Sequence, residues 1–73
     1  MKIYKINIKY FIYDAFCAHI IVANSEQEVR EIAKNKCADE GKDVWDSAEI
    51  EECGEYTGKE TEPFVLLSHF NAC

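Results

Sequence analysis

Hydrophobic and polar residues alternate at the start of the chain in a pattern typical of paired strands. Every second residue from Tyr4 to Tyr10 is apolar, and the residues between them are Lys or Asn. After a turn near Tyr13-Asp14, residues 16–23 are largely apolar on both faces. This second pattern predicts a strand in the interior of a sheet. Because the connection is short, the two strands are predicted to pair as an antiparallel hairpin.

A helix is predicted over residues 26–38. Ser25, followed three positions later by Glu28, forms a capping-box sequence in which each side chain satisfies free backbone donors. An apolar stripe follows at helical spacing, and Gly41 provides a stop signal. The stripe consists of Val29, Ile32, Ala33 and Cys37.

The second half of the chain has a weaker pattern. Residues 48–53 alternate enough to predict a short strand, and residues 54–62 are rich in turn formers. Phe64 to Leu67, followed by Phe70, are apolar enough to predict a strand buried on both faces. The order is therefore β-β-α-β-β. We expect one α+β domain over residues 1–73, an antiparallel sheet of three to four strands with one helix on one face.

Length and composition limit the molecule to a small globular domain. The chain has 73 residues, of which 48% are hydrophobic and 30% are charged. No run of about 18 apolar residues predicts a membrane span. Asp14 and His19 interrupt the apolar stretch near the N-terminus, which is unlike a signal peptide. A cytoplasmic location is therefore predicted.

Charge is distributed unevenly along the chain. The net charge is -6, which argues against direct nucleic-acid binding because phosphates attract basic proteins. Residues 1–38 sum to +2, residues 39–73 sum to -8, and the last eleven residues carry no charge. The acidic region is interpreted either as a solvated surface that keeps the protein soluble or as a face that docks onto a basic partner.

Trp45 bears on the choice between these two interpretations. It either covers the small core below the helix or is an exposed aromatic anchor surrounded by acids, as at interface hot spots. The candidate partner-binding residues are Asp39, Glu40, Asp43, Trp45, Asp46, Glu49, Glu51 and Glu52.

Motifs for catalysis or metal binding are weak. No serine lies in a G-x-S-x-G turn, and the sequence has neither a glycine-rich phosphate loop nor EF-hand spacing. A Cys–His catalytic set would need a cleft that so small a chain has little room to form. Zinc binding would require Cys17, His19, His69 and Cys73, without any C-x-x-C pair. We therefore predict a non-enzymatic protein without cofactor or metal, in which the cysteines are buried thiols.

Two stretches of the chain resemble a family of small phage- and prophage-encoded proteins. The first is ADEGKDVW over residues 38–45, with Cys53 eight residues after the tryptophan, and the second is VLLSHFNA over residues 65–72. Members of the family have a hairpin, a helix that opens with Ser-Glu, an acidic stretch with a tryptophan, and an ending close to Phe-Asn-Ala-Gly. This chain has Cys73 in place of that glycine. The resemblance implies a mobile-element accessory protein in the bacterial cytoplasm, and it carries over no catalytic residue.

Small acidic proteins of mobile elements often bind host machinery, as anti-CRISPR proteins do. By that analogy we expect a non-enzymatic inhibitor that binds a basic, nucleic-acid-handling host protein, such as a CRISPR effector, through its acidic surface. Two alternatives are a small zinc or thiol module and a self-associating structural or assembly protein. Homodimerisation is expected in either case, because a core this small is marginal and an exposed strand edge favours pairing.

Overall fold

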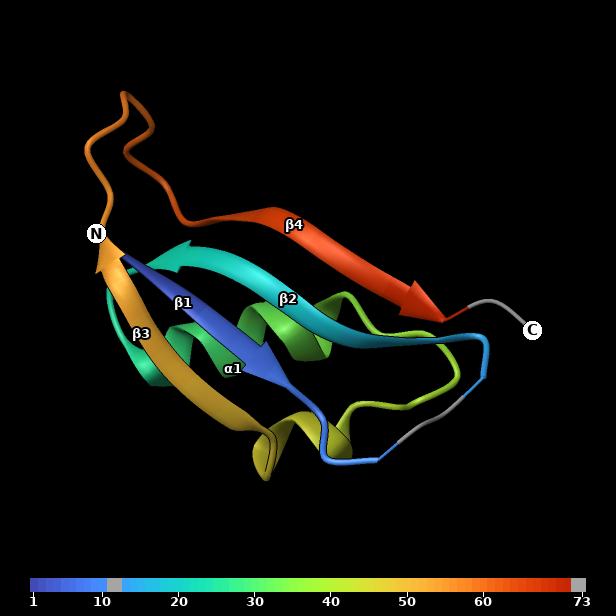
Figure 1. Ribbon diagram of the computed structural model, residues 1–73. Coiled ribbons are helices and arrows are strands. Elements are labelled where there is room, and N and C mark those ends of the chain that lie inside the picture. The colour runs from blue at the N-terminus through green and yellow to red at the C-terminus, as the bar shows by residue number, and fades with distance from the viewer. Residues whose placement is uncertain (11–12, 72–73) are drawn as a thin grey trace.

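A four-stranded antiparallel sheet with a helix against one face forms the fold in the computed structural model (Figure 1). The structure describes residues 1–10 and 13–71. It confirms the predicted α+β class and the β-β-α-β-β order. The elements are β1 (Lys2–Asn7), β2 (Ala15–Ala23), α1 (Glu26–Asn35), the 3₁₀ helix η1 (Asp43–Asp46), β3 (Glu49–Glu55) and β4 (Phe64–Asn71).

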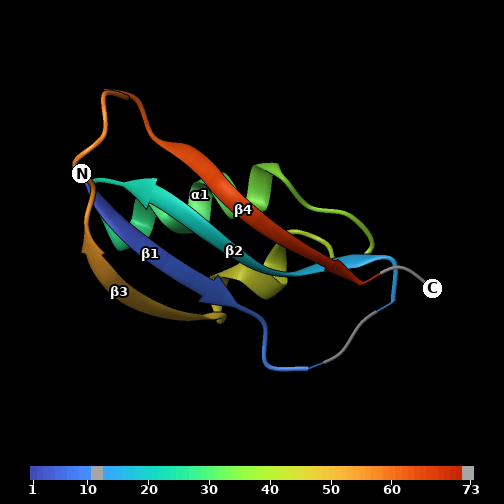
Figure 2. The same cartoon turned by 45° about the horizontal axis from the view of Figure 1, so that its top comes forward.

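The strands lie in the order β3-β1-β2-β4, so β3 and β4 form opposite edges of the sheet (Figure 2). β1 and β2 pair as the predicted antiparallel hairpin, with Tyr4 opposite Ile21 and Ile6 opposite His19. The predicted interior position of β2 is also confirmed, since it pairs with β1 and with β4. The connection over residues 56–63 therefore passes around one end of the two central strands.

The helix begins where the sequence predicts and ends earlier. Ser25 is the N-cap, and its hydroxyl accepts a hydrogen bond from the backbone N–H of Glu28. The Glu28 carboxylate in turn accepts from the backbone N–H of Asn24, one residue before the cap. The predicted end at residue 38 is wrong because the Lys36 N–H bonds to the Ala33 carbonyl, a tighter i to i+3 turn that closes the helix after Asn35.

The core lies between the sheet and the layer formed by α1 and η1. β1 and β2 contribute Tyr4, Ile6 and Ile21, and α1 contributes Val29 and Ala33. η1 adds the indole of Trp45, the largest fully buried side chain. The apolar pair at residues 44–45 thus belongs to a short 3₁₀ helix that covers the open end of the core.

The last strand differs most from its prediction. β4 is expected to be buried on both faces, but Leu66 is 54% exposed and Leu67 is 66% exposed. The reason is its position, because in the described part of the chain β4 pairs with β2 alone and nothing covers its other side. β1 is also shorter than the alternation suggests, since it ends at Asn7 and leaves Tyr10 exposed. Among the described ranges, no helix is long and apolar enough to cross a membrane.

Candidate functional site

Exposed carboxylates lie along β3, the edge strand next to β1, on both faces of the sheet. We call the four glutamates of this strand the acidic edge, and each of them is exposed. They hold their places because Ile50 faces inward opposite Ile6 and anchors the strand to the core. In the register with β1, Glu49 and Glu51 lie opposite Asn7 and Lys5 and point to the open face of the sheet. Glu52 and Glu55 lie opposite Tyr4 and Lys2, on the face that α1 covers. The acidic edge consists of Glu49, Glu51, Glu52 and Glu55.

The spacing of these glutamates makes their electrostatic potentials overlap. A strand rises about 3.3 Å per residue, so Glu49 and Glu51 lie roughly 7 Å apart and the whole edge is about 20 Å long. The Debye length at 0.1 M salt is about 10 Å, which exceeds the distance between neighbouring carboxylates. The acidic edge therefore presents one continuous negative potential to an approaching partner at moderate salt.

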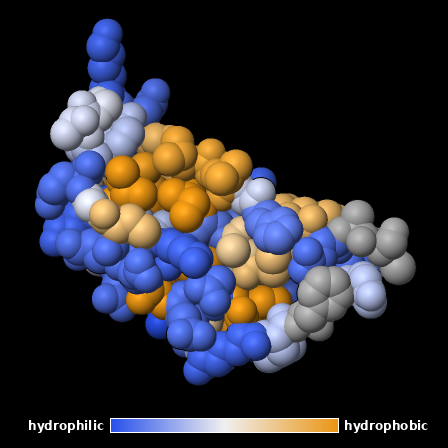
Figure 3. All heavy atoms as spheres, viewed as in Figure 1, coloured by the Kyte–Doolittle hydropathy of each residue, from blue (hydrophilic) through white to orange (hydrophobic). Residues whose placement is uncertain are grey.

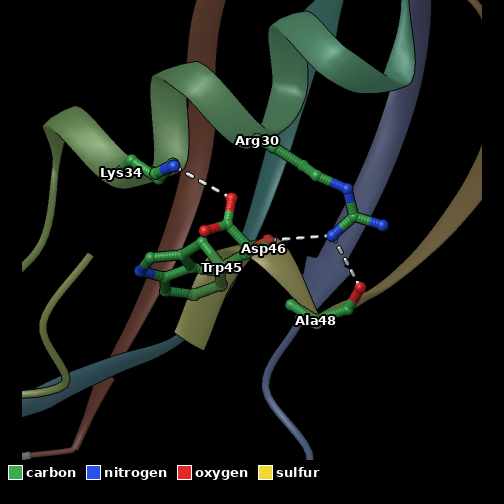
Figure 4. Close-up of polar contacts among 5 residues, drawn as sticks. All are labelled: Arg30, Lys34, Trp45, Asp46 and Ala48. Atoms are coloured by element: carbon green, nitrogen blue, oxygen red, sulfur yellow. Dashed lines mark hydrogen bonds and ion pairs between the residues drawn. The ribbon is translucent and has the colours of Figure 1, made fainter. Parts of the chain in front are cut away.

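Two further carboxylates, Asp43 and Asp46, extend this surface along η1, which directly precedes β3. Arg30 of α1 fixes η1 in place, because one guanidinium nitrogen donates to the carbonyls of Trp45 at 2.8 Å and Ala48 at 2.9 Å (Figure 4). Lys34 on the same helix pairs with Asp46 at 2.9 Å. The site is therefore built on a helix, a 3₁₀ helix and a strand that are joined by hydrogen bonds.

Lysines partly neutralise two of the surface carboxylates. Lys2 lies 3.3 Å from Glu52, and the hydrogen bond and charge of Glu52 raise the pKa of Lys2 above its ordinary value. The hydrogen bond to Asp46 likewise raises the pKa of Lys34. Glu49, Glu51, Glu55 and Asp43 have no ion pair within the residues described, although Lys5 lies opposite Glu51 in the register, so these four carry most of the negative potential of the surface.

The structure corrects the predicted site at Glu40 and Trp45, which are buried. Trp45 is 0% exposed and Glu40 is 6% exposed. The Glu40 carboxylate accepts hydrogen bonds from the indole N–H of Trp45 and from the backbone N–H groups of Phe16 and Ala38, each at 3.0 Å. Both residues therefore stabilise the core. Of the two interpretations of Trp45, the one that places it over the core is confirmed.

Asp39 is exposed but does not lie with the acidic edge. Its backbone N–H donates to the carbonyl of Asp14, and the N–H of Asp14 donates to the carbonyl of Asn71. Asp39 is thereby placed beside the end of β4, whereas β3 is the opposite edge of the sheet. Of the eight predicted residues, five are exposed on η1 and β3, namely Asp43, Asp46, Glu49, Glu51 and Glu52, although β3 presents its glutamates on both faces of the sheet. The prediction misses Glu55, which is exposed on the same strand three positions after Glu52.

The residues considered for zinc do not converge in the described part of the chain. The imidazole of His19 is buried beside Trp45, and the thiol of Cys17 donates to the backbone carbonyl of His69 at 3.5 Å. No group of three or more potential ligands forms within residues 1–10 and 13–71. The thiols of Cys17, Cys37 and Cys53 are free, but the prediction that they are buried is wrong, because Cys53 is exposed and the other two are half-buried. Cys73 lies outside the described residues.

One pair of catalytic residue types comes together without a sequence motif to predict it. The imidazole Nδ1 of His19 lies 2.7 Å from the hydroxyl of Ser68, on neighbouring strands. Within the described residues the other ring nitrogen, Nε2, has no hydrogen-bond partner, so no acid orients the ring. Burial, together with the nearby charge of Lys36, lowers the pKa of His19 to about 4, which makes it a weak base. This contact is thus a core hydrogen bond and not a nucleophile with its base.

Comparisons of the chain with protein-family models, curated proteins and solved structures find no match. The resemblance to phage- and prophage-encoded proteins therefore stays a prediction that rests on residues 38–45 and 65–72. The function must be argued from the surface itself.

Proposed function

We propose that this protein is a non-enzymatic inhibitor that binds a basic, nucleic-acid-handling protein through the acidic edge and the adjoining acids of η1. The observation that carries the proposal is the set of exposed glutamates on β3, which follows the exposed Asp43 and Asp46 of η1 directly in the chain. A surface that binds the phosphates of nucleic acid attracts a dense row of carboxylates by the same long-range force. Occupying that surface would exclude the nucleic acid.

The shape of the site supports binding to a folded protein surface. The carboxylates project from both faces of one sheet edge, so a basic groove that receives this edge would meet negative charge on each of its walls. Charged side chains on an edge strand also discourage backbone pairing with a foreign strand. Recognition therefore depends on side-chain charge, and arginine is the favoured counterpart because it binds carboxylates through two parallel hydrogen bonds.

The resemblance described above narrows the class of target. A protein of a mobile element that acts in the bacterial cytoplasm meets the nucleases that defend the host, and a CRISPR effector is the target we propose. Such effectors hold nucleic acid in a positively charged channel.

The test is capture of a target with matched charge variants. Tagged protein is incubated with nuclease-treated bacterial lysate at about 0.1 M and about 1 M salt, and bound proteins are identified by mass spectrometry. One triple variant carries Glu49→Gln, Glu51→Gln and Glu55→Gln on the acidic edge. The control carries Glu31→Gln, Glu60→Gln and Glu62→Gln, which are exposed elsewhere and change the net charge equally.

We expect a basic nucleic-acid-binding protein to be recovered at low salt, to be lost at high salt, and to fall about tenfold with the acidic-edge variant alone. The purified target should then release labelled nucleic acid when the wild-type protein is added. Equal loss in both triple variants would show that total charge, and not this edge, drives binding. Release of no nucleic acid from the captured target would contradict inhibition.

A further inference from the structure

β4, at the opposite side of the sheet, is an edge without charged side chains, and its protection is limited to Pro63 before the strand and a register shift against β2 at Leu66. Residues 63–71 contain no charged side chain, and Leu66 and Leu67 are more than half exposed. Native sheets protect their edges with charges, prolines, bulges or a covering element, because unpaired backbone groups invite another strand. β3 is protected by its glutamates, whereas within the described chain the outer side of β4 is covered by nothing.

The sheet face that α1 leaves open adds an apolar surface beside this edge. Hydrophobic atoms gather on that face over β4 and β2 (Figure 3). Ile20 lies opposite Leu67 in the register of β2 with β4, and Val22 lies opposite Phe64. A shallow hollow lies between the two strands, and Leu67 forms part of its rim. The edge and the apolar surface therefore meet at Leu67.

The distribution of charge identifies a second copy of this chain as the occupant of the edge. Two copies with a net charge of -6 repel each other wherever their acidic residues approach. The sheet order places the acidic edge on one side and β4 on the other, so pairing through β4 keeps the two acidic edges as far apart as the fold allows. In a symmetric dimer the same edge of both copies meets, and an edge without charge can do so without repulsion between like charges.

We propose that two copies pair antiparallel through β4 about a two-fold axis perpendicular to the sheet. The result is one continuous eight-stranded sheet with an acidic edge at each end. Cross-strand partners point to the same face of a sheet, whereas consecutive residues of one strand point to opposite faces. The residue at the two-fold axis must therefore lie opposite the same residue of the other copy. The middle of β4 (Phe64–Asn71) places that axis at Leu67 or Ser68. Leu67 of one copy then lies opposite or diagonal to Leu67 of the other.

The test uses this symmetry. The mass of the protein in solution is measured by sedimentation and light scattering for wild type, Leu67→Glu and Leu67→Lys. We expect the wild type to be a dimer and each variant to be a monomer, because two like charges would meet near the axis. An equimolar mixture of the two variants is expected to restore the dimer, because the opposite charges then attract each other.

Two controls separate this proposal from misfolding and from the proposed function. Circular dichroism should give the same spectrum for the Leu67 variants as for wild type, and Glu51→Gln on β3 should remain a dimer. A wild-type monomer at all concentrations, or a mixture of Leu67 variants that stays monomeric, would overturn the proposal. Loss of the dimer should leave the capture of a basic target through β3 intact, so the two proposals fail independently.

Discussion

Glu40 is a buried carboxylate that is satisfied by hydrogen bonds. It accepts N–H groups from β2, from the segment after α1 and from the indole of Trp45. A buried charge is tolerated only when its oxygens are satisfied in this way. Glu40 therefore joins three separate segments below the core. Its role is structural, although the acidic residues near it in the sequence are exposed to solvent.

Replacing Glu40 with Gln tests this role. The amide of glutamine carries one oxygen acceptor and one NH₂ donor, so at least one of the three N–H groups would face another donor. We expect Glu40→Gln to lower the free energy of unfolding by about 1–3 kcal/mol. Urea denaturation followed by Trp45 fluorescence measures the change. Glu49→Gln, on the exposed acidic edge, should change stability by less than about 0.5 kcal/mol.

His19 makes stability depend on pH. Its ring is 1% exposed and packs 5.0 Å from the ring of Trp45. Burial is the main cause that lowers its pKa to about 4, with Lys36 adding to the shift and Glu40 opposing it. Protonation would place a second ring N–H in the core, where the described residues offer Nε2 no acceptor. The neutral ring is therefore the form that the fold stabilises.

The sign of the effect follows from comparison with the unfolded chain, in which histidine has a pKa of about 6.5. Between pH 6.5 and about 4 the unfolded state binds a proton that the folded state does not. The contribution of His19 to stability is therefore complete above pH 6.5 and is lost as the pH falls through about 4, by roughly 3 kcal/mol in total. Urea denaturation at several pH values should show this loss in wild type and not in His19→Gln. Parallel pH profiles for the two proteins would show that His19 is not responsible.

At the scale of the element, the N-terminus of α1 depends on Ser25. Its hydroxyl accepts from the N–H of Glu28 at 3.2 Å, a donor that has no partner within the helix. Ser25→Ala is expected to lower the free energy of unfolding by about 1 kcal/mol. Thermal and urea denaturation measure the change. Ser47→Ala, an exposed serine after η1, is the matched control and should have little effect.

Arg30 links two elements, and its removal tests how η1 is held. Arg30→Met keeps the aliphatic stem and removes both hydrogen bonds to the carbonyls of Trp45 and Ala48. We expect a loss of about 1–3 kcal/mol, because hydrogen bonds from a charged donor are among the stronger ones. The emission of Trp45 should also shift to the red as η1 loosens. Unchanged emission together with unchanged stability would contradict this role of Arg30.

The elements show what the sequence could predict and what it could not. The hairpin and the start of α1 follow from local patterns, namely two-residue alternation before Asn7 and the Ser25 cap. The position of β4 at the edge does not follow from its local pattern, because an apolar strand can have the same sequence in the middle of a sheet and at its edge. The sequence could not show that Glu40 is buried, or decide between the two positions of Trp45, for a similar reason. Their burial depends on the long-range contact between Glu40 and Phe16, which are 24 positions apart.

At the scale of the whole molecule, charge and apolar surface are separated to opposite edges of one sheet. Three carboxylates of the acidic edge, those of Glu49, Glu51 and Glu55, form no ion pair within the described residues, so they repel one another in the folded protein. Two unit charges about 7 Å apart in water repel by about 0.6 kcal/mol before salt screening. A surface that served solubility alone would gain nothing from concentrating this repulsion on one strand.

Repulsion among the glutamates of the acidic edge should lower the stability of the folded protein. The triple variant Glu49→Gln, Glu51→Gln and Glu55→Gln should unfold with a free energy roughly 0.5–1 kcal/mol higher than wild type at low salt, because the repulsion is relieved. The gain should disappear near 1 M salt, where the Debye length is about 3 Å. The control triple variant at residues 31, 60 and 62 should gain less, since Glu31 lies on α1, away from Glu60 and Glu62 in the connection between β3 and β4. A more stable protein that no longer captures its basic target would identify β3 as a surface where binding and stability oppose each other. Equal stability gains in both triple variants would instead assign the effect to net charge alone.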